Sequence, residues 1–508
     1  LRNTVLLLDN AYISATDDGI KIDYGSNGAN NSNLAALIMV DSDASIDAGD
    51  DGIKLKDDAD NWNIDIDGNV HGDEDGIDIG YNSNDNYVTN SGTITGGENG
   101  VRIFRNSDDN DIINTGSITG TDDGVNISRN SEDNYIYNDG SITGTNSDGV
   151  DIDGDDNTVY NDSDGTILGL NHGVYIDGDD NVVNNVGGLI SASNSTAGVA
   201  IFGDDNEVYN TGTIGSDGYY DPEYGVWVTG DDNVIVNEDT SAESGSRGSI
   251  RGAEAGIGVS GTGNLIMNGN TGDLGGVVGD ELGDLEEEFD IWFQNQGQFL
   301  GGDVVGENAG IYVGEHSGHD PEENFIINGE GGLVEVTGGT CAPEQFNSDC
   351  IEAPVAAIDS GDSVLGGGSE EGDFLLVVNA GTIQGESEFH EGFIQVDTMT
   401  QGSDGAELFD TDGVTPLGAD GTPDFTVTPA AIETDPPVVA DILVPATIQD
   451  ASRLAVRDGD GELVLVNLDG GVINGDVEAG AGDDVLAMET GSTLNGNADL
   501  GSTPGTSP

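Results

Sequence analysis

Positive charge is scarce in this sequence. Eleven Lys and Arg residues stand against 98 Asp and Glu in 508 residues, which gives a formal net charge of −87. Charge of this sign repels nucleic-acid phosphates and anionic lipid headgroups, so we expect neither as a direct partner. No stretch of the sequence approaches the ~18 consecutive apolar residues of a membrane-spanning helix, and insertion into a bilayer is not expected. Neutral or cationic partners remain, Ca²⁺ included.

Cysteine is also rare. Cys341 and Cys350 are the two cysteines of the chain, and such a close pair predicts a short-loop disulfide formed in an oxidising compartment, with a free buried pair as the alternative. The 82 glycines follow no Gly-X-Y triplet, which excludes collagen. Low hydrophobicity with high net charge is typical of disordered chains, but apolar residues recur here at regular spacing, and this excludes disorder for most of the chain.

A repeat of about 24 residues runs through the first half of the chain. A Gly-Val or Gly-Ile step recurs with spacings of 24 to 27 residues, and its glycines are Gly52, Gly76, Gly100, Gly124, Gly149, Gly173, Gly198 and Gly225. Within each repeat, three short segments alternate apolar and polar residues, as at 125–127, 134–138 and 140–144. Three strands per repeat predict an all-β parallel β-helix, a solenoid whose coils stack ~4.8 Å apart.

The alternation also predicts which residues point inward, because residues two apart share one side of a strand. The first inward column is Val101, Val125, Val150, Val174, Val199 and Val226, with Ile103, Ile127, Ile152, Ile176, Ile201 and Val228 two residues on. The second column is Val88, Ile112, Ile136, Val159, Val183, Val208 and Ile235. The third is Ile94, Ile118, Ile142, Ile167, Ile190, Ile214 and Ile250.

Asparagines flank the second column in pairs. The pairs are Asn86 and Asn90, Asn110 and Asn114, Asn134 and Asn138, Asn157 and Asn161, Asn181 and Asn185, Asn206 and Asn210, and Asn233 and Asn237. Parity places them inside the helix, where a stacked amide can hydrogen bond to the copies above and below. We interpret them as structural.

The repeat predicts three regions along the chain. Residues 1–335 are expected to form regular β-helix, 336–460 a continuation with long loop excursions and the small disulfide loop, and 461–508 terminal coils and a tail. The Asn-x-Gly-x-Ile-x-Gly signature returns at 379–385 and, loosened, at 467–475. Residues 270–300 and 338–372 are predicted to leave the coils, and the proline-rich stretch 403–445 is predicted to be loops or a small side module.

The strand pattern resembles that of pectin-lyase-like right-handed parallel β-helices, and the whole chain resembles an autotransporter passenger domain. The second resemblance depends on the Asn-x-Gly-x-Ile-x-Gly coils, the close cysteine pair, and the tail 470–477 followed by 480–486. It implies a right-handed helix and a secreted location, either extracellular or at a bacterial cell surface.

The candidate metal site is an aspartate column directly before the first inward asparagine of each coil. Its members are Asp85, Asp109, Asp133, Asp156, Asp180, Asp205 and Asp232. Stacked carboxylates at this spacing repel by roughly 0.8 kcal/mol per pair even at the dielectric constant of water. Oxygen ligands suit Ca²⁺, so calcium is the expected cofactor, and a solvated turn in a salt-rich medium is the alternative. Residues 480–486 also resemble one copy of a calcium-binding nonapeptide repeat.

The candidate catalytic residues are Asp151, Asp153, Asp177 and Arg129. Asp153 and Asp177 share a predicted column one coil apart, which is compatible with the ~5 Å separation of a retaining glycosidase pair. The segment Asn171-His172-Gly173 resembles part of a polygalacturonase site, but the Arg-x-Lys that such a site needs further on is missing. His316 and His319 are interpreted as an exposed polar loop rather than a metal cluster.

Outward aromatic residues form a candidate partner surface of Tyr137, Tyr160, Tyr209, Tyr175 and Trp227. Such rows bind sugars or proteins, or else stiffen the sheet, and both interpretations stay open. The expected function is a non-catalytic rod in adhesion, aggregation or matrix formation. Its expected partners are a host-cell or neighbouring-cell surface, a glycan, or further copies of itself in an oligomer or filament. A secreted polysaccharide lyase, hydrolase or epimerase is the alternative.

Overall fold

The computed structural model describes residues 4–8, 10–23, 36–193, 196–215, 222–239, 247–269, 300–306, 309–314, 324–337, 356–360, 374–385, 389–396, 407–409, 442–449, 454–459, 461–480, 482 and 484–501. Strands dominate these residues, and none of them forms a helix long and apolar enough to cross a membrane.

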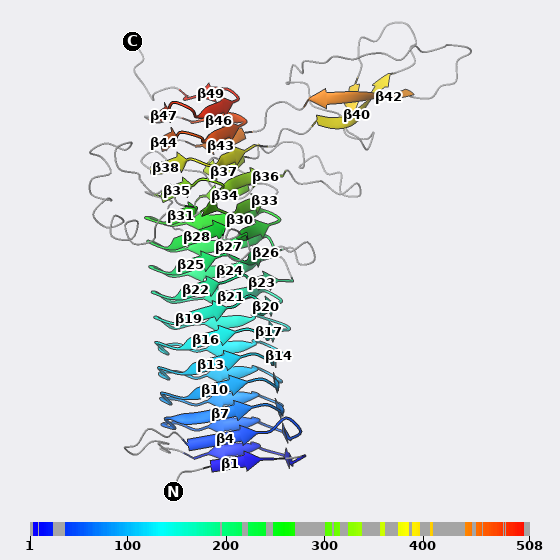
Figure 1. Ribbon diagram of the computed structural model, residues 1–508, viewed down its shortest axis with the longest axis vertical. Helices are drawn as coiled ribbons and strands as arrows, with labels where there is room; N and C mark the ends of the chain where they lie inside the picture. Colours follow the sequence, from blue (N-terminus) through cyan, green and yellow to red (C-terminus); the bar gives the residue numbers. More distant parts are fainter. Residues whose placement is uncertain are drawn as a thin grey trace.

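Three parallel sheets, A, B and C, form the three sides of a right-handed parallel β-helix that rises as a rod from the N-terminus to the C-terminus (Figure 1). Each coil contributes one strand to each sheet, and successive coils pair in register. The fold class predicted from the repeat is confirmed.

Sheet A consists of β1 (Thr4–Leu7), β4 (Ala36–Val40), β7 (Trp62–Ile66), β10 (Tyr87–Asn90), β13 (Asp111–Asn114), β16 (Tyr135–Asn138), β19 (Thr158–Asn161), β22 (Val182–Asn185), β25 (Glu207–Asn210), β28 (Val234–Asp239), β31 (Leu265–Asn268), β35 (Asn324–Asn328), β38 (Phe374–Asn379), β44 (Glu462–Asn467) and β47 (Val485–Met488), with β32 (Leu300–Gly301) antiparallel to β28. Sheet B consists of β2 (Tyr12–Ala15), β5 (Ser45–Ala48), β8 (Asn69–Gly72), β11 (Thr93–Gly96), β14 (Ser117–Gly120), β17 (Ser141–Gly144), β20 (Thr166–Gly169), β23 (Leu189–Ala192), β26 (Thr213–Gly215), β29 (Ser249–Gly252), β33 (Asp303–Gly306), β36 (Leu333–Val336), β39 (Thr382–Gln384), β45 (Val472–Asn474) and β48 (Thr493–Asn495). Sheet C consists of β3 (Ile20–Ile22), β6 (Ile53–Leu55), β9 (Ile77–Ile79), β12 (Val101–Ile103), β15 (Val125–Ile127), β18 (Val150–Ile152), β21 (His172–Ile176), β24 (Ala197–Phe202), β27 (Tyr224–Thr229), β30 (Ala255–Ser260), β34 (Ala309–Val313), β37 (Ala356–Ser360), β43 (Leu454–Asp458), β46 (Asp476–Glu478) and β49 (Ala498–Asp499).

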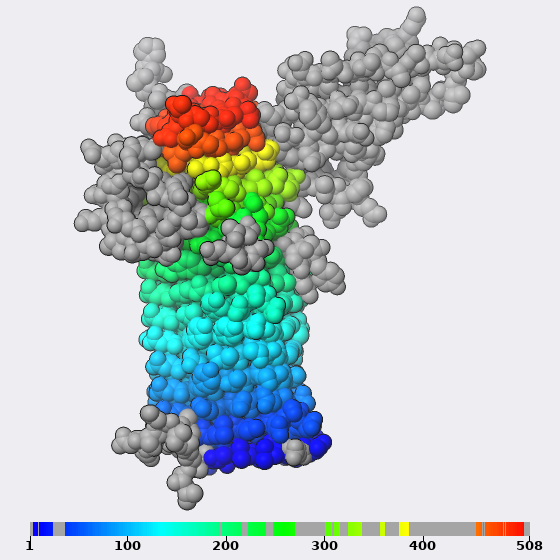
Figure 2. Space-filling model, in the orientation of Figure 1, coloured from blue at the N-terminus to red at the C-terminus, as the bar shows by residue number. Residues whose placement is uncertain are grey.

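One apolar cluster fills the inside of the rod from the first coils to the last. The three predicted inward columns are confirmed, since every member is at most 1% exposed. Full burial of one such Val or Ile side chain contributes about 1.5–3 kcal/mol, so the stack of columns is the main source of stability. Figure 2 shows the described coils as successive bands of colour along a continuous rod.

The repeating glycine is required by close approach between coils. A Cβ built on Gly76 would lie 2.5 Å from the carbonyl oxygen of Gly100 and 2.5 Å from Cγ2 of Ile94, and Gly100 has the same relation to Gly124 and Ile118. Any larger residue here would push the coils apart. In the coils with β6, β9, β12, β15 and β18, the Gly-Val/Ile step therefore marks the start of the strand in sheet C.

The paired asparagines form two continuous ladders inside the rod, as predicted. In one ladder, Nδ2 of Asn114 donates to Oδ1 of Asn138 at 2.8 Å, and Asn138 donates to Asn161 at 2.8 Å. In the other, the backbone N–H and Nδ2 of Asn110 both donate to Oδ1 of Asn134, at 3.0 and 3.1 Å. The same amides also donate to turn carbonyls, so polar groups that would be costly to bury unpaired are satisfied from coil to coil.

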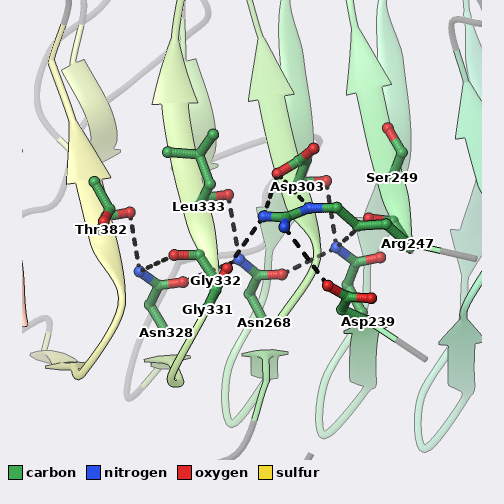
Figure 3. A network of polar contacts seen from close by, with 12 residues as sticks. Asp239, Arg247, Ser249, Asn268, Asp303, Asn328, Gly331, Gly332, Leu333 and Thr382 are labelled. Atoms are coloured by element: carbon green, nitrogen blue, oxygen red, sulfur yellow. Dashed lines mark hydrogen bonds and ion pairs between the residues drawn. The ribbon is translucent and has the colours of Figure 1, made fainter. Parts of the chain in front are cut away.

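The first of these ladders continues where the spacing of the coils becomes irregular. Asn268 donates to Asn328 at 2.9 Å and to the carbonyl of Leu333 at 3.2 Å (Figure 3). Beside it, Arg247 bonds the carboxylate of Asp303 at 2.7 Å and the carbonyl of Gly331 at 3.1 Å. This arginine therefore links three consecutive coils through its contacts with Asp303 and Gly331.

The expected continuation toward the C-terminus is confirmed at β38, β39, β44 and β45. One expectation is wrong: residues 338–372 do not leave the helix throughout, because Ala356–Ser360 forms β37 of sheet C. A separate antiparallel sheet forms from β40 (Phe389–Val396), β41 (Glu407–Phe409) and β42 (Ile442–Gln449). The strand β41 and the first half of β42 lie in the stretch 403–445, where loops or a small side module were predicted, whereas β40 precedes it. Cys341, Cys350, His316 and His319 lie outside the described residues.

Adjacent asparagines on β22 provide a direct test of the ladder. Asn185 is fully buried and bonded to Asn161, Asn210 and Thr213, whereas Asn184 points outward on the same strand. We expect Asn185→Ala to destabilise the fold by about 2–3 kcal/mol, because its neighbours lose buried partners. Asn184→Ala should change stability by less than about 0.5 kcal/mol. Urea unfolding of both variants checks this, and equal midpoints would contradict a stabilising ladder.

Candidate functional site

The outer face of sheet C and the turn that precedes it gather charged and aromatic side chains. Two columns of side chains carry most of these groups. The first column is formed by the residues directly before the repeating glycines, which are Asp51, Asp75, Asn99, Asp123, Asp148 and His172. The second is formed by the outward residues of the sheet C strands, which are Lys54, Asp78, Arg102, Asn126, Asp151 and Tyr175. Because parallel coils stack in register, each of these residues faces its counterparts one coil above and below.

Near the N-terminus the two columns form a cluster of three buried aspartates and two partly exposed basic residues. Lys54 contacts Asp51 and lies 3.1 Å from the carboxylate of Asp78. Arg102 lies 3.1 Å from Asp75 and 3.0 Å from Asp78. The three aspartates are at most 2% exposed. Burial raises the pKa of Asp75 to about 7 and raises that of Asp78, in both cases against the opposing charge of Arg102. This cluster is not among the sites predicted from the sequence.

In the middle of the rod the same columns carry mainly acids. The Nδ2 of Asn126 bridges Asp123 at 3.1 Å and Asp151 at 2.7 Å. Burial and then the negative charges of Asp123, Asp153, Asp148 and Asp177 raise the pKa of Asp151 to about 8. Asp151 is therefore protonated near neutral pH, which makes it a potential proton donor.

The predicted catalytic residues do lie on neighbouring coils. Arg129 Nε lies 3.7 Å from the carboxylate of Asp153. Asp153 and Asp177 follow consecutive strands of sheet C in the same column, and burial together with the charge of Asp177 raises the pKa of Asp153. His172, one coil above Asp148, lies 2.8 Å from that carboxylate through Nδ1. The arrangement places a protonated carboxyl beside a partly exposed carboxylate.

Above this acidic stretch, the outer face of sheet C becomes aromatic. The ring of Tyr175 lies 5.2 Å from that of His172 and 5.4 Å from that of Phe202, and all three are half-buried. Trp227 packs against Tyr224, with the ring centroids 4.5 Å apart and the rings tilted by 47°, and is only 7% exposed. Tyr175 can thus contact a partner, whereas Trp227 mainly packs within the structure.

On sheet A the outward tyrosines also form a row. Tyr137 and Tyr160 stack with ring centroids 5.6 Å apart, and the Tyr137 hydroxyl donates to Asp162 at 2.6 Å. The Tyr209 hydroxyl donates to Glu207 at 2.9 Å. Both predicted interpretations of these residues, stiffening and binding, fit this geometry.

Backbone conformation explains the residue type of the aspartate column. All seven members have φ between 55° and 57°, the left-handed region, which Asp and Asn adopt more readily than most residues. The acids one residue before this column are held by hydrogen bonds between coils. Oδ1 of Asp155 accepts the backbone N–H of Asp179 at 2.9 Å, and Oδ1 of Asp179 accepts that of Asp204 at 2.8 Å. Among the described residues, the groups of three acids close enough to share a metal ion lie elsewhere, on the turns between sheets B and C and, through Asp78, on β9 of sheet C. Calcium at the aspartate column stays a prediction.

No protein-family model, curated protein or solved structure matches this chain. The fold therefore defines the class, a three-sided right-handed parallel β-helix, and the resemblance to particular families carries no further support.

Substitutions at Asp109 separate conformation from metal binding. Asp109 has φ of 57°, and burial together with the charges of Asp133 and Asp85 raises its pKa. We expect Asp109→Asn to leave stability equal or slightly higher, because it keeps the conformational preference and removes repulsion. Asp109→Val should cost about 1–2 kcal/mol, since a β-branched residue is strained there. Urea midpoints in metal-free buffer check this, and a loss in the Asn variant would contradict the conformational explanation.

The raised pKa of Asp151 predicts a pH dependence. From about pH 4, where the unfolded chain loses this proton, to about pH 8, where the folded protein loses it, the stability of the fold should decline as pH rises. Asp151→Asn should therefore stabilise the protein at pH 8 by on the order of 2 kcal/mol and have little effect at pH 4. Melting temperatures across this range measure the difference. The exposed Asp122→Asn serves as the matched control, and a pH-independent gain in Asp151→Asn would argue against the assignment.

Proposed function

We propose that the protein is a non-catalytic, secreted or surface-displayed rod that acts in adhesion, aggregation or matrix formation. The observation that carries the proposal is the unbroken stacking of the coils in three sheets, each with 15 strands in its path. At ~4.8 Å per coil this gives a rod of roughly 70 Å. Such a rod presents long outer faces at a distance from its attachment.

The use of polar residues supports a passive scaffold. Asparagines bond to asparagines of the next coil, and acids such as Asp179 accept backbone N–H groups of the next coil. These side chains are engaged in holding the coils together, so most of the repeat contributes stacking rather than chemistry. The resemblance to autotransporter passengers and the acidic composition favour an extracellular or bacterial cell-surface location.

The outer faces suggest the partner class. Half-exposed rings at Tyr175 and Phe202 on sheet C lie beside the acids of the preceding coils, and Tyr137 and Tyr160 form a second row on sheet A. Aromatic faces with solvent-exposed hydroxyls can bind glycans and protein surfaces. The high negative charge of the chain favours partners that are neutral or cationic. Cell surfaces, glycans and further copies of the chain are the proposed partners.

Adhesion of coated beads tests the proposal. Beads that carry the purified chain should adhere to cells, to glycan-coated surfaces or to one another. Replacing two partly exposed aromatics, as Tyr175→Ser with Phe202→Ser or Tyr137→Ser with Tyr160→Ser, should lower adhesion about fivefold or more for the face that binds, because each ring contributes about 1 kcal/mol. The other pair is the matched control. Beads that adhere to none of these surfaces would contradict an adhesive role.

A second candidate, polysaccharide cleavage, is favoured by one observation, the protonated Asp151 near the Asp153 carboxylate. It requires release of sugar fragments from an acidic or neutral polysaccharide, with loss of that activity in Asp153→Asn and Asp177→Asn. Adhesion that persists in those variants without any sugar release would support the rod.

A further inference from the structure

The turn between sheets B and C carries a second concentration of acids in the first three coils. Asp17 and Asp18 lie between β2 and β3, Asp50 and Asp51 between β5 and β6, and Glu74 between β8 and β9. Backbone hydrogen bonds hold these turns in a stack: the N–H of Gly19 donates to the carbonyl of Asp51 at 2.9 Å, and that of Glu74 donates to Asp50 at 3.1 Å.

Two carboxylate triads meet at Asp50. One consists of Asp17, Asp18 and Asp50, and the other of Asp50, Asp51 and Glu74. Within each triad the ligand oxygens all lie within 4.8 Å of one another. Each triad draws its acids from two consecutive coils, so a single ion at Asp50 would tie neighbouring coils together.

A buried oxygen points to a missing partner at this place. The side chain of Asp18 is 1% exposed, and its Oδ2 contacts Lys21. Its Oδ1 is also buried but has no hydrogen-bond partner among the described residues. A buried carboxylate oxygen without a donor is costly unless a cation satisfies it.

Local cations do not balance the local charge. Lys21 pairs with Asp18, and Lys54 is shared between Asp51 and Asp78. Five carboxylates in the two triads therefore face two ammonium groups, one of which is also engaged elsewhere.

We propose that these turns bind a divalent metal cation, with Ca²⁺ the best fit, centred on Asp50 and drawing on Asp17, Asp18, Asp51 and Glu74. Carboxylate oxygens are the ligands that Ca²⁺ prefers, and partly exposed turns accommodate its flexible coordination better than the strict octahedron of Mg²⁺. The site differs from the aspartate column predicted from the sequence, which lies before sheet A. It does not depend on the adhesive function.

The next coil shows why the site is limited to the first three. Where Asp18, Asp51 and Asp75 precede the earlier glycines, Asn99 precedes Gly100. Its Nδ2 donates to Oδ1 of Asp75 at 2.9 Å, and Arg102 lies beside the same carboxylate. The protein supplies its own donors there, and a metal ion is not required.

Calcium binding to the EDTA-treated full chain, measured by titration calorimetry at fixed ionic strength, tests the proposal. We expect binding in the ~0.1–1 mM range, weakened roughly tenfold or more by Asp50→Asn, because the number of charged ligands sets calcium affinity. Asp18→Asn and Glu74→Gln identify which triad contributes more. Asp164→Asn, which removes the same charge from an exposed turn outside both this site and the aspartate column, should leave this binding unchanged.

Hydrogen exchange of the unmodified protein gives a second measurement that does not depend on a variant folding. Ca²⁺ should slow exchange in residues 12–22, 45–55 and 69–79, with little change at 150–190. Equal protection along the whole rod, equal protection by Na⁺ at the same ionic strength, or unaltered calcium binding by Asp50→Asn would each overturn the proposal.

Discussion

Registration of each coil on the next is the constraint on which the rest of this structure depends. A coil of about 24 residues encloses too little apolar volume to be stable alone, and its buried asparagine amides depend on the coils above and below for part of their hydrogen bonds. The stack therefore imposes identical spacing on valine, isoleucine, glycine and asparagine. A Cβ at the repeating glycine would clash with the carbonyl oxygen of the next coil, so the close stacking also determines which position of the repeat must be glycine.

The same registration creates the electrostatic difficulty of the outer surface. Residues of one kind fall into columns, so a chain with 98 acids accumulates carboxylates at strand spacing. The protein handles them in several ways. The aspartate column before sheet A occupies left-handed turn positions that face solvent, and the column of Asp155 and Asp179 accepts backbone N–H groups of the next coil. Near the N-terminus, Lys54 and Arg102 pair with the buried aspartates. At Asp151, a retained proton lowers the negative charge.

Sequence periodicity predicted the inside of the rod well and the outside poorly, for a physical reason. Inward positions are constrained by one requirement, apolar or amide contact with the next coil, so spacing alone identified the valine, isoleucine and asparagine columns. Outer sites depend on contacts across adjacent columns and on turn conformation, and these are not visible in a single period. Asp75 and Arg102 come from different columns of different coils, and Trp227, although it points outward, is almost wholly covered. The aspartate column was found from its regularity, but its positive φ was not. The sequence does contain a signal for the buried acids: the residue directly before the repeating glycine is an aspartate at Asp51, Asp75, Asp123 and Asp148.

Because each coil contacts only its neighbours, these local solutions act independently along the rod. In a solenoid, stability is close to a sum of coil and interface contributions, so a change in protonation at Asp151 affects the middle coils without necessarily disturbing the first three. The charge that remains is greatest where neither a basic side chain nor a backbone donor compensates it. A rod built in this way can keep its apolar interior and amide ladders constant while its outer columns vary from coil to coil. Variation outside a fixed interior is what a long binding surface requires, and it is also why the interior alone does not identify the partner.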